Sequence, residues 1–255
     1  MHLKILSSLL IALLWCSTAF SSIDIKPDES LENQYKELEL KALGGDIESQ
    51  YSLFLMVIRN EPHLNHHASN AFKQIISAAQ SGHTNAQFTI GSLYQTGHIV
   101  KKDVDVALSW LKEAASKEHV DAQYLVGSNY FSRRKEAKGA KRDEYVKQAE
   151  FWYEKAIDNG NLNALWQLGL LLVTTEENVE RGKELIRNAA SKSDKRAMYF
   201  AAINYKHLWL KSGKKSDFDK AIKWFEKSAN LGHADSANEL KGLIKSAEKT
   251  PFYGG

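Results

Sequence analysis

The stretch that decides the fold is residues 82–118, which read GHTNAQFTIGSLYQTGHIVKKDVDVALSWLKEAASKE. Its first half places Ala86, Ile90 and Tyr94 at positions i, i+4 and i+8, so that they share one face of a helix. Its second half has the same helical periodicity around Trp110. The stretch therefore predicts two amphipathic helices joined by a short loop.

Versions of this stretch occur five times, and each can be aligned on one small residue near the start of its first helix. These alignment residues are Ser49, Ala86, Ala122, Ala164 and Ala197, and a partial sixth copy begins at Ser236. A period of 33 to 42 residues is typical of helix-pair repeats, which bury their apolar faces by stacking on their neighbours. The sequence thus predicts an all-α protein, a right-handed α-solenoid of about twelve helices in antiparallel pairs.

The repeat pattern sets the expected domain boundaries. The solenoid is predicted to cover residues 30–248, beginning with a capping helix at 30–43 and ending with a helix at about 234–248. Between them, five repeats start near residues 45, 82, 118, 160 and 193. Residues 22–29 are expected to be a linker and residues 249–255 a tail.

Three kinds of small or turn residue recur between and within the repeats. Gly91, Gly127 and Gly169 occupy one position of the first helices, where the missing side chain should let the partner helix approach closely. Glycines close several second helices, and Glu118-His119 takes the same place without glycine, so its turn should be less favourable. The histidines that follow these turns are His83, His119 and His233, which we interpret as turn residues and not as a catalytic group.

The first 21 residues have the layout of a secretory signal peptide. Lys4 precedes an apolar run that ends in small residues before Ser21, which predicts cleavage after Ser21 or Ser22 and a periplasmic or secreted protein. An uncleaved membrane anchor is the first alternative, but the run is shorter than the roughly 20 residues that span a bilayer. A lipoprotein signal at Cys16 is the second, and the bulky Trp15 before it argues against that reading.

Composition excludes several classes of function for the mature chain. Without the signal peptide it carries 33 basic and 31 acidic residues, a balance that implies neither nucleic acid nor a strongly anionic membrane as partner. The only cysteine, Cys16, leaves with the signal peptide, which excludes disulfides, a thiol nucleophile and a cysteine-ligated metal. We expect no cofactor, no metal, no stable membrane insertion after cleavage, and a monomer.

The residues of the second repeat carry a family resemblance. The run from Ala86 to Ala115 joins Ile90-Gly91, Tyr94, a Gly97-x-Ile-Val turn, Asp103 and Trp110 at spacings that resemble the Sel1-like repeat, a relative of the tetratricopeptide repeat. The resemblance covers nearly all of residues 30–247, although the loop turn itself occurs only in this repeat. Proteins of this family are mostly adaptors and regulators that hold other proteins, and the resemblance implies an exported bacterial member with that role.

One face of the first helices is the predicted partner-binding surface, because in stacked helix pairs it lines the concave side. An aromatic residue stands at the same position of this face in all five repeats, and interface hot spots are enriched in such residues. This aromatic ladder consists of Tyr51, Phe88, Tyr124, Trp166 and Tyr199, and Phe131 and Leu170 extend the same face. The alternative is that each aromatic simply packs against the next repeat. Trp110, Trp152 and Trp224 of the second helices are expected in the core.

Two further segments bear on partners. The connection from Arg133 to Glu144 has six basic and three acidic residues, so Arg133 and Arg134 could steer an acidic partner, although a solvated loop is the more common outcome. The loop that contains His63, His66 and His67 has metal-ligand residue types. Since no neighbouring carboxylate or cysteine completes a site of known spacing, we predict a solvated loop there.

No motif of catalysis is present, so we expect a non-enzymatic interaction module. Some exported relatives are cysteine-rich and linked to β-lactam binding or hydrolysis, and this chain lacks their cysteines. Two roles stay open at this point. One is an adaptor or regulator of an envelope complex, and the other is an immunity protein that neutralises a toxic secreted effector such as a phospholipase.

Overall fold

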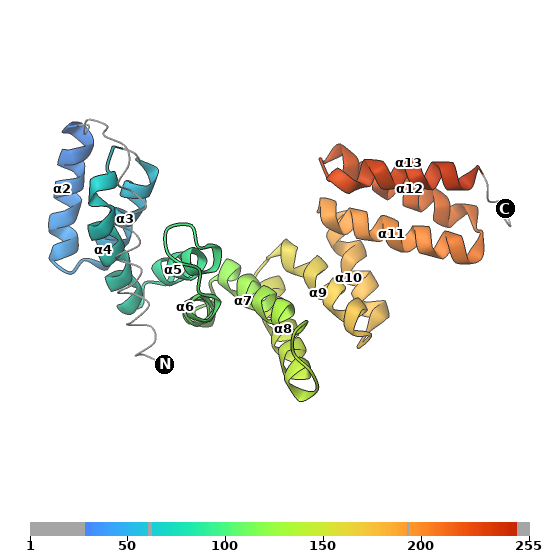
Figure 1. The fold of residues 1–255 in the computed structure, drawn as a ribbon, viewed down its shortest axis with the longest axis horizontal. Coiled ribbons are helices and arrows are strands. Elements are labelled where there is room, and N and C mark those ends of the chain that lie inside the picture. The colour runs from blue at the N-terminus through green and yellow to red at the C-terminus, as the bar shows by residue number, and fades with distance from the viewer. Residues whose placement is uncertain (1–28, 61–62, 193, 249–255) are drawn as a thin grey trace. The chain divides into compact units, whose positions relative to one another are not determined.

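The computed structural model describes residues 29–60, 63–192 and 194–248, and in these it contains twelve α-helices and one 3-10 helix (Figure 1). The predicted signal peptide, most of the linker and the tail lie outside the described residues. The chain divides into two compact parts, an N-terminal half, Met1–Val126, and a C-terminal half, Gly127–Gly255, with the boundary inside helix α7. The predicted all-α fold of stacked helix pairs is confirmed.

The N-terminal half begins with the predicted capping helix, which the structure places at α2, one residue longer than expected. Each repeat then contributes a pair of helices, α3 with α4 and α5 with α6, and neighbouring pairs contact each other through α4 and α5. The elements are α2 Glu29–Leu43, α3 Ile47–Arg59, the 3-10 helix η1 Asn65–His67, α4 Ala68–Gln80, α5 Thr84–Thr96, α6 Val104–Ser116 and the first part of α7 Val120–Arg133.

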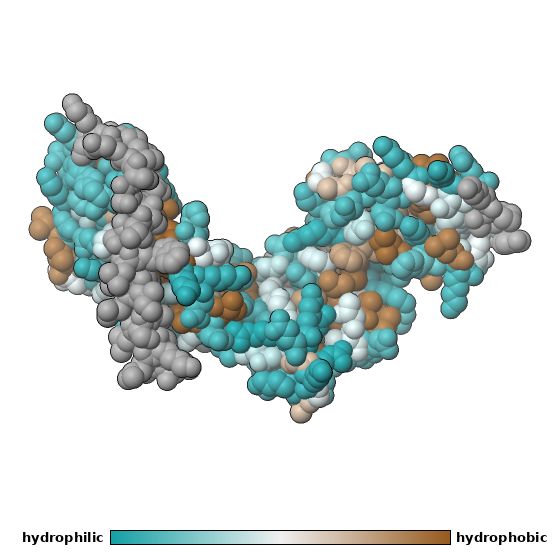
Figure 2. All heavy atoms as spheres, in the orientation of Figure 1, coloured by the Kyte–Doolittle hydropathy of each residue, from teal (hydrophilic) through white to brown (hydrophobic). Residues whose placement is uncertain are grey.

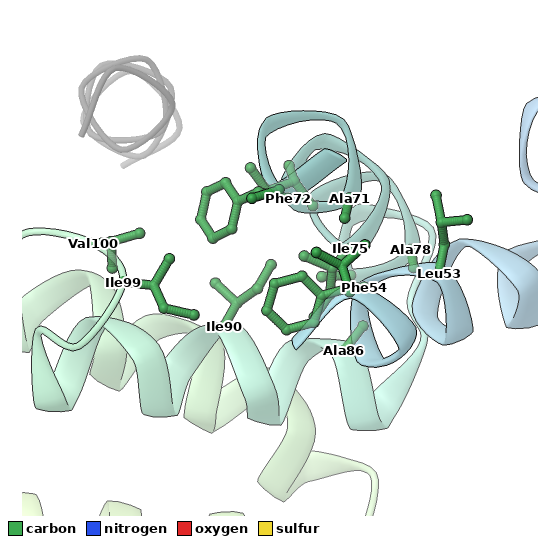
Figure 3. Packing of buried hydrophobic residues seen from close by; sticks show 14 of the residues in the cluster. Leu53, Phe54, Ala71, Phe72, Ile75, Ala78, Ala86, Ile90, Ile99 and Val100 are labelled. Carbon is green, nitrogen blue, oxygen red and sulfur yellow. The ribbon is translucent and has the colours of Figure 1, made fainter. Parts of the chain in front are cut away.

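A continuous apolar core runs through this half. Figure 3 shows Phe54 of α3, Phe72 of α4 and Ile90 of α5 pointing toward one another. Ile99 and Val100, from the loop after α5, close the same cluster and are buried. The loop folds back because Gly97 takes a left-handed conformation at the end of α5 and because the backbone N–H of residue 103 donates to the carbonyl of residue 94 at 3.0 Å.

The C-terminal half repeats the arrangement, and three of its helices, of 19, 18 and 16 residues, are longer than those of the N-terminal half. Here α9 pairs with α10 and α11 with α12, while α13 packs on α12 as the terminal helix. Two apolar clusters form its core, one between α9, α10 and α11 and one between α11, α12 and α13. The elements after α7 are α8 Ala140–Asp158, α9 Leu162–Thr175, α10 Val179–Ser191, α11 Lys195–Ser212, α12 Lys215–Asn230 and α13 Ala234–Ala247.

The alignment residues mark the start of each first helix, because the residue three positions earlier caps the helix. His83 Nδ1 accepts the N–H of Ala86 at 3.1 Å, and Asn161 Oδ1 accepts that of Ala164 at 3.2 Å. Asp46, His119 and Asp194 do the same for Ser49, Ala122 and Ala197. These caps satisfy backbone donors that the first helical turn leaves without partners. The interpretation of His83 and His119 as turn residues is confirmed, and their role is capping.

The glycines of the first helices lie where the partner helix comes closest, as predicted. A Cβ atom added at Gly91 would lie 2.7 Å from Leu111 Cγ, and one at Gly127 would lie 2.7 Å from Tyr153 Cδ1. At Gly169 the contact is with backbone, since the added atom would lie 2.7 Å from the carbonyl oxygen of Gly182. Only a residue without a side chain leaves room for this approach.

The prediction for the tryptophans of the second helices is correct for one of the three. Trp110 is buried, but Trp152 and Trp224 are only half-buried. In α8 and α12 the fully buried aromatic residue is the next one along, Tyr153 and Phe225 respectively. Successive residues are about 100° apart around a helix, so when Tyr153 and Phe225 face the centre of the core the tryptophans before them lie to one side of it.

Candidate protein-binding surface

In the N-terminal half, the aromatic ladder stacks on the capping histidines of the following repeat. The ring of Tyr51 on α3 lies 4.7 Å from that of His83, and the ring of Phe88 on α5 lies 4.3 Å from that of His119 in a stacked arrangement. Tyr51, Phe88 and Tyr124 of α7 are all half-buried. Each of the first two aromatics therefore packs against the next repeat, as the alternative reading predicted, and keeps part of its surface exposed.

In the C-terminal half the ladder continues with a histidine partner for Tyr199 and a different partner for Trp166. Tyr199 of α11 stacks on His233 at 4.5 Å, and burial, followed by the charges of two nearby carboxylates, raises the pKa of its hydroxyl. Trp166 of α9 is buried, so the structure does not support it as an exposed hot spot. Its ring stacks on Phe200 at 5.3 Å, and the guanidinium of Arg196 lies 5.1 Å above it. Phe200 has no distinguishing pattern in the sequence, and it serves as stacking partner here because the cap position that is histidine after Tyr51, Phe88 and Tyr199 is Asp194 in this repeat.

The basic connection is shorter than predicted, and Arg134 is not a free surface charge. Helix α7 runs to Arg133, which is half-buried, and α8 begins at Ala140, so part of the predicted loop is helical. The Arg134 guanidinium lies 3.8 Å over the ring of Phe131 and donates to the Phe131 carbonyl at 2.6 Å and to Thr174 Oγ1 at 3.0 Å. Burial, and then the charge of Arg142, lower the pKa of Arg134. Arg134 thus joins the ends of α7 and α9.

A strip of half-buried apolar side chains follows the first-helix face of α9 and α11. Leu170 and Val173 of α9 pack on one core cluster, and Tyr199 and Ile203 of α11 pack on the next. Arg196 borders the strip, with two-fifths of its side chain exposed, and donates to Asn163 Oδ1 at 2.6 Å. Elsewhere the surface visible in Figure 2 is largely hydrophilic, with hydrophobic residues in small groups. We name Leu170, Val173, Tyr199 and Ile203 the apolar strip.

The histidine loop differs from its prediction. His63 is exposed as expected, but exposed His66 and half-buried His67 of η1 both contact a carboxylate that the local sequence does not contain. Glu32 of α2 lies 2.8 Å from His66 Nε2 and 3.0 Å from His67 Nε2. Burial pushes the pKa of the Glu32 carboxyl upward, but the two histidines outweigh that effect and hold it below its usual value. These three residues form a group that could hold a metal ion in the described part of the chain.

Comparisons with known proteins identify the repeats. The Sel1 repeat family matches residues 84–119, 120–161 and 195–233. These segments are the second, third and fifth predicted repeats. The helix pairs that begin near residues 45 and 160 lie outside the matched segments.

Several solved structures are similar to this chain. A Sel1 repeat protein from Oxalobacter formigenes is 26% identical with a TM-score of 0.60, over 77% of this chain and 78% of that chain. The antigen c5321 from uropathogenic Escherichia coli is 21% identical with a TM-score of 0.41, over 85% and 61%. The immunity protein Pa5087 from Pseudomonas aeruginosa is 20% identical with a TM-score of 0.40, over 75% and 68%. No curated protein matches the sequence.

The described α-helices are between 13 and 19 residues long. None of those in residues 29–60, 63–192 and 194–248 is long and apolar enough to cross a bilayer.

Proposed function

We propose that this chain, which carries Sel1 repeats, is a non-enzymatic binding module that holds a protein partner on the first-helix face of α9 and α11. The observation that carries the proposal is the apolar strip. Its side chains pack on the core from one side and stay partly exposed on the other, along two first helices of the same half. Repeat solenoids use such extended surfaces to bind other proteins.

The strip has the properties of an interface centre. Aromatic and aliphatic side chains fixed by packing lose little conformational entropy on binding, because their rotamers are already restricted. Tyr199 is such a side chain, since its ring is held between His233 and the edges of Phe200 and Phe225. Arg196 adds a cation at the border, where charges contribute orientation more than affinity. The partner surface should therefore be apolar at its centre.

The module is proposed to act outside the cytoplasm, as the signal-peptide pattern of residues 1–21 predicts. Adaptor or regulator of an envelope complex is the role we favour, because it needs nothing beyond reversible binding of one partner. Identification of the captured protein also decides the open alternative. A toxic effector that loses its activity on binding would assign the immunity role, whereas a component of an envelope complex would assign the adaptor role.

Affinity capture from an envelope extract tests the proposal. The wild-type protein should retain a partner, and L170E and I203E, which place a charge in the apolar strip, should retain at least tenfold less. Phe151 of α8 is a matched control, because it is an exposed apolar residue on a second helix and F151E leaves the strip intact. Circular dichroism must show all variants folded. If L170E and I203E retained as much partner as the wild type and F151E retained less, the binding surface would lie outside the apolar strip.

Incubation with a chromogenic β-lactam tests the enzymatic alternative, and we expect no turnover. Hydrolysis that scaled with protein concentration would contradict the non-enzymatic assignment.

A further inference from the structure

We infer that Glu32, His66 and His67 form a binding site for one Zn²⁺ ion that fastens the capping helix α2 to the first repeat. The site lies at the junction of α2 with η1, where two segments more than thirty residues apart in sequence meet. It is separate from the apolar strip, which belongs to the C-terminal half.

The donor atoms have the type and spacing that zinc requires. Two imidazole nitrogens and one carboxylate oxygen are the ligand set of several zinc sites that keep one position open for water. Bonds of about 2.0–2.2 Å in a tetrahedron place neighbouring ligand atoms about 3.3–3.5 Å apart. Here the nitrogen–oxygen distances are 2.8 and 3.0 Å, and the ligand atoms all lie within 4.8 Å of one another. Lengthening the two nitrogen–oxygen distances by a few tenths of an ångström would bring each of these pairs to the tetrahedral spacing.

The arrangement of the carboxylate favours a cation between the ligands. Glu32 Oε1 is shielded from solvent, and His66 Nε2 lies 2.8 Å away. A metal ion beside these two atoms would use both lone pairs. Only about one sixth of the Glu32 side chain is exposed, so water cannot fully solvate its charge.

The surrounding residues hold the ligands in place. The ring of His67 stacks on Tyr35 with 3.6 Å between centroids and 11° between planes, and Tyr35 is fully buried. Asn70 of α4 donates to the Tyr35 hydroxyl at 2.7 Å and to Glu39 Oε1 at 2.5 Å. These two hydrogen bonds connect α4 with α2, the helix that carries Glu32. The ring of His66 lies 4.1 Å from that of His67. Such support by a packed outer layer is what preorganises a metal site.

The ligand set also selects the class of metal. Imidazole nitrogens suit zinc, copper and nickel, whereas magnesium and calcium prefer oxygen ligands alone. His66, with nearly half of its side chain exposed, leaves one side of the group open to solvent, so that an ion can enter and keep a water molecule. Because both bound segments belong to the folded state, zinc should raise the stability of the N-terminal half.

Calorimetric titration of the full chain with ZnCl₂ tests the inference, on protein from which any polyhistidine tag has been cleaved and bound metal removed by chelation. We expect one Zn²⁺ per chain, a rise in melting temperature of several degrees at saturating zinc, and no response to Mg²⁺. H66A and E32Q should each weaken binding at least tenfold, and E32Q keeps the size of the side chain in case H66A alters the loop. H63A removes a neighbouring, exposed histidine outside the group and should bind zinc as the wild type does.

Absence of stoichiometric binding would overturn the site. Binding that H66A and E32Q leave unchanged would overturn it as well, because zinc would then be held by other surface histidines.

Discussion

Replacing Gly169 by alanine should destabilise the protein, whereas the same change at Gly242 should not. Both glycines lie inside helices, α9 and α13, so in each case alanine improves intrinsic helix stability by up to about 1 kcal/mol. The surroundings differ. The new Cβ at Gly169 would lie 2.7 Å from the Gly182 carbonyl oxygen and 2.8 Å from Ile186 Cγ1, while at Gly242 nothing lies within 4 Å.

The difference between the two variants isolates the close approach of α9 and α10, because the helix-propensity gain cancels. Backbone cannot rotate away from the Cβ atom as a side chain can, so the helices must separate by about half an ångström or more, and overpacking of this kind costs about 1–3 kcal/mol. We therefore expect G169A to be less stable than G242A by about 1–3 kcal/mol in urea denaturation followed by circular dichroism. If G169A proved as stable as G242A, the glycine would not be what permits the approach.

Two further predictions concern the turn between α6 and α7. Glu118 has a left-handed backbone with φ of 63°, so E118G should raise the free energy of unfolding by about 0.5–1 kcal/mol in thermal denaturation. The control E113G, inside α6, should lower it by about 1 kcal/mol. A loss of stability in E118G would contradict the strain assigned to this turn. His119 caps α7 as a neutral acceptor, and burial lowers its pKa below 6.5, so the folded protein binds fewer protons than the unfolded chain and its stability should fall as the pH drops below about 6.5. H119N keeps a capping oxygen that does not titrate, so it should reduce the loss of stability between pH 7.5 and 5.0. The control H98N, at an exposed loop position, should lose as much stability as the wild type. Equal pH profiles for H119N and the wild type would refute the role of His119.

The helices and their pairing could be predicted from the sequence because the same pattern of apolar and small residues recurs in each repeat. A single amphipathic segment leaves its ends uncertain, but five aligned copies fix the small residue that starts each first helix. The structure buries all of these residues, from Ser49 to Ala197. The depth of individual side chains was less predictable. Trp152 and Trp224 have the spacing of Trp110, yet they are only half-buried, and the adjacent Tyr153 and Phe225 are the aromatics that lie in the centre.

The surface residues show the limit of reasoning from one helix at a time. A helical wheel places Tyr51 and Phe88 on an outer face of their own repeat, but it contains no neighbour. In the folded chain the capping histidine of the next repeat covers each ring, so the residue that caps one helix also packs against the previous one. The same reason explains why Arg134 is not the free surface charge that the sequence predicts, since its partner Thr174 lies in the following repeat.

These contacts nevertheless have a regularity that a repeat sequence reveals. Many side-chain bonds between neighbouring repeats join residues about one period apart. Separations of 35 residues connect Glu32 with His67, Tyr35 with Asn70 and Glu48 with His83, and separations of 33 connect Asn163 with Arg196 and Lys206 with Glu239. Adjacent repeats stack directly, so a side chain on one repeat contacts residues near its counterpart on the next repeat. Complementary groups should therefore be sought at the repeat period and not only at local motif spacings. By that rule the histidines of η1 lead to Glu32, although no local pattern in their loop includes a carboxylate ligand.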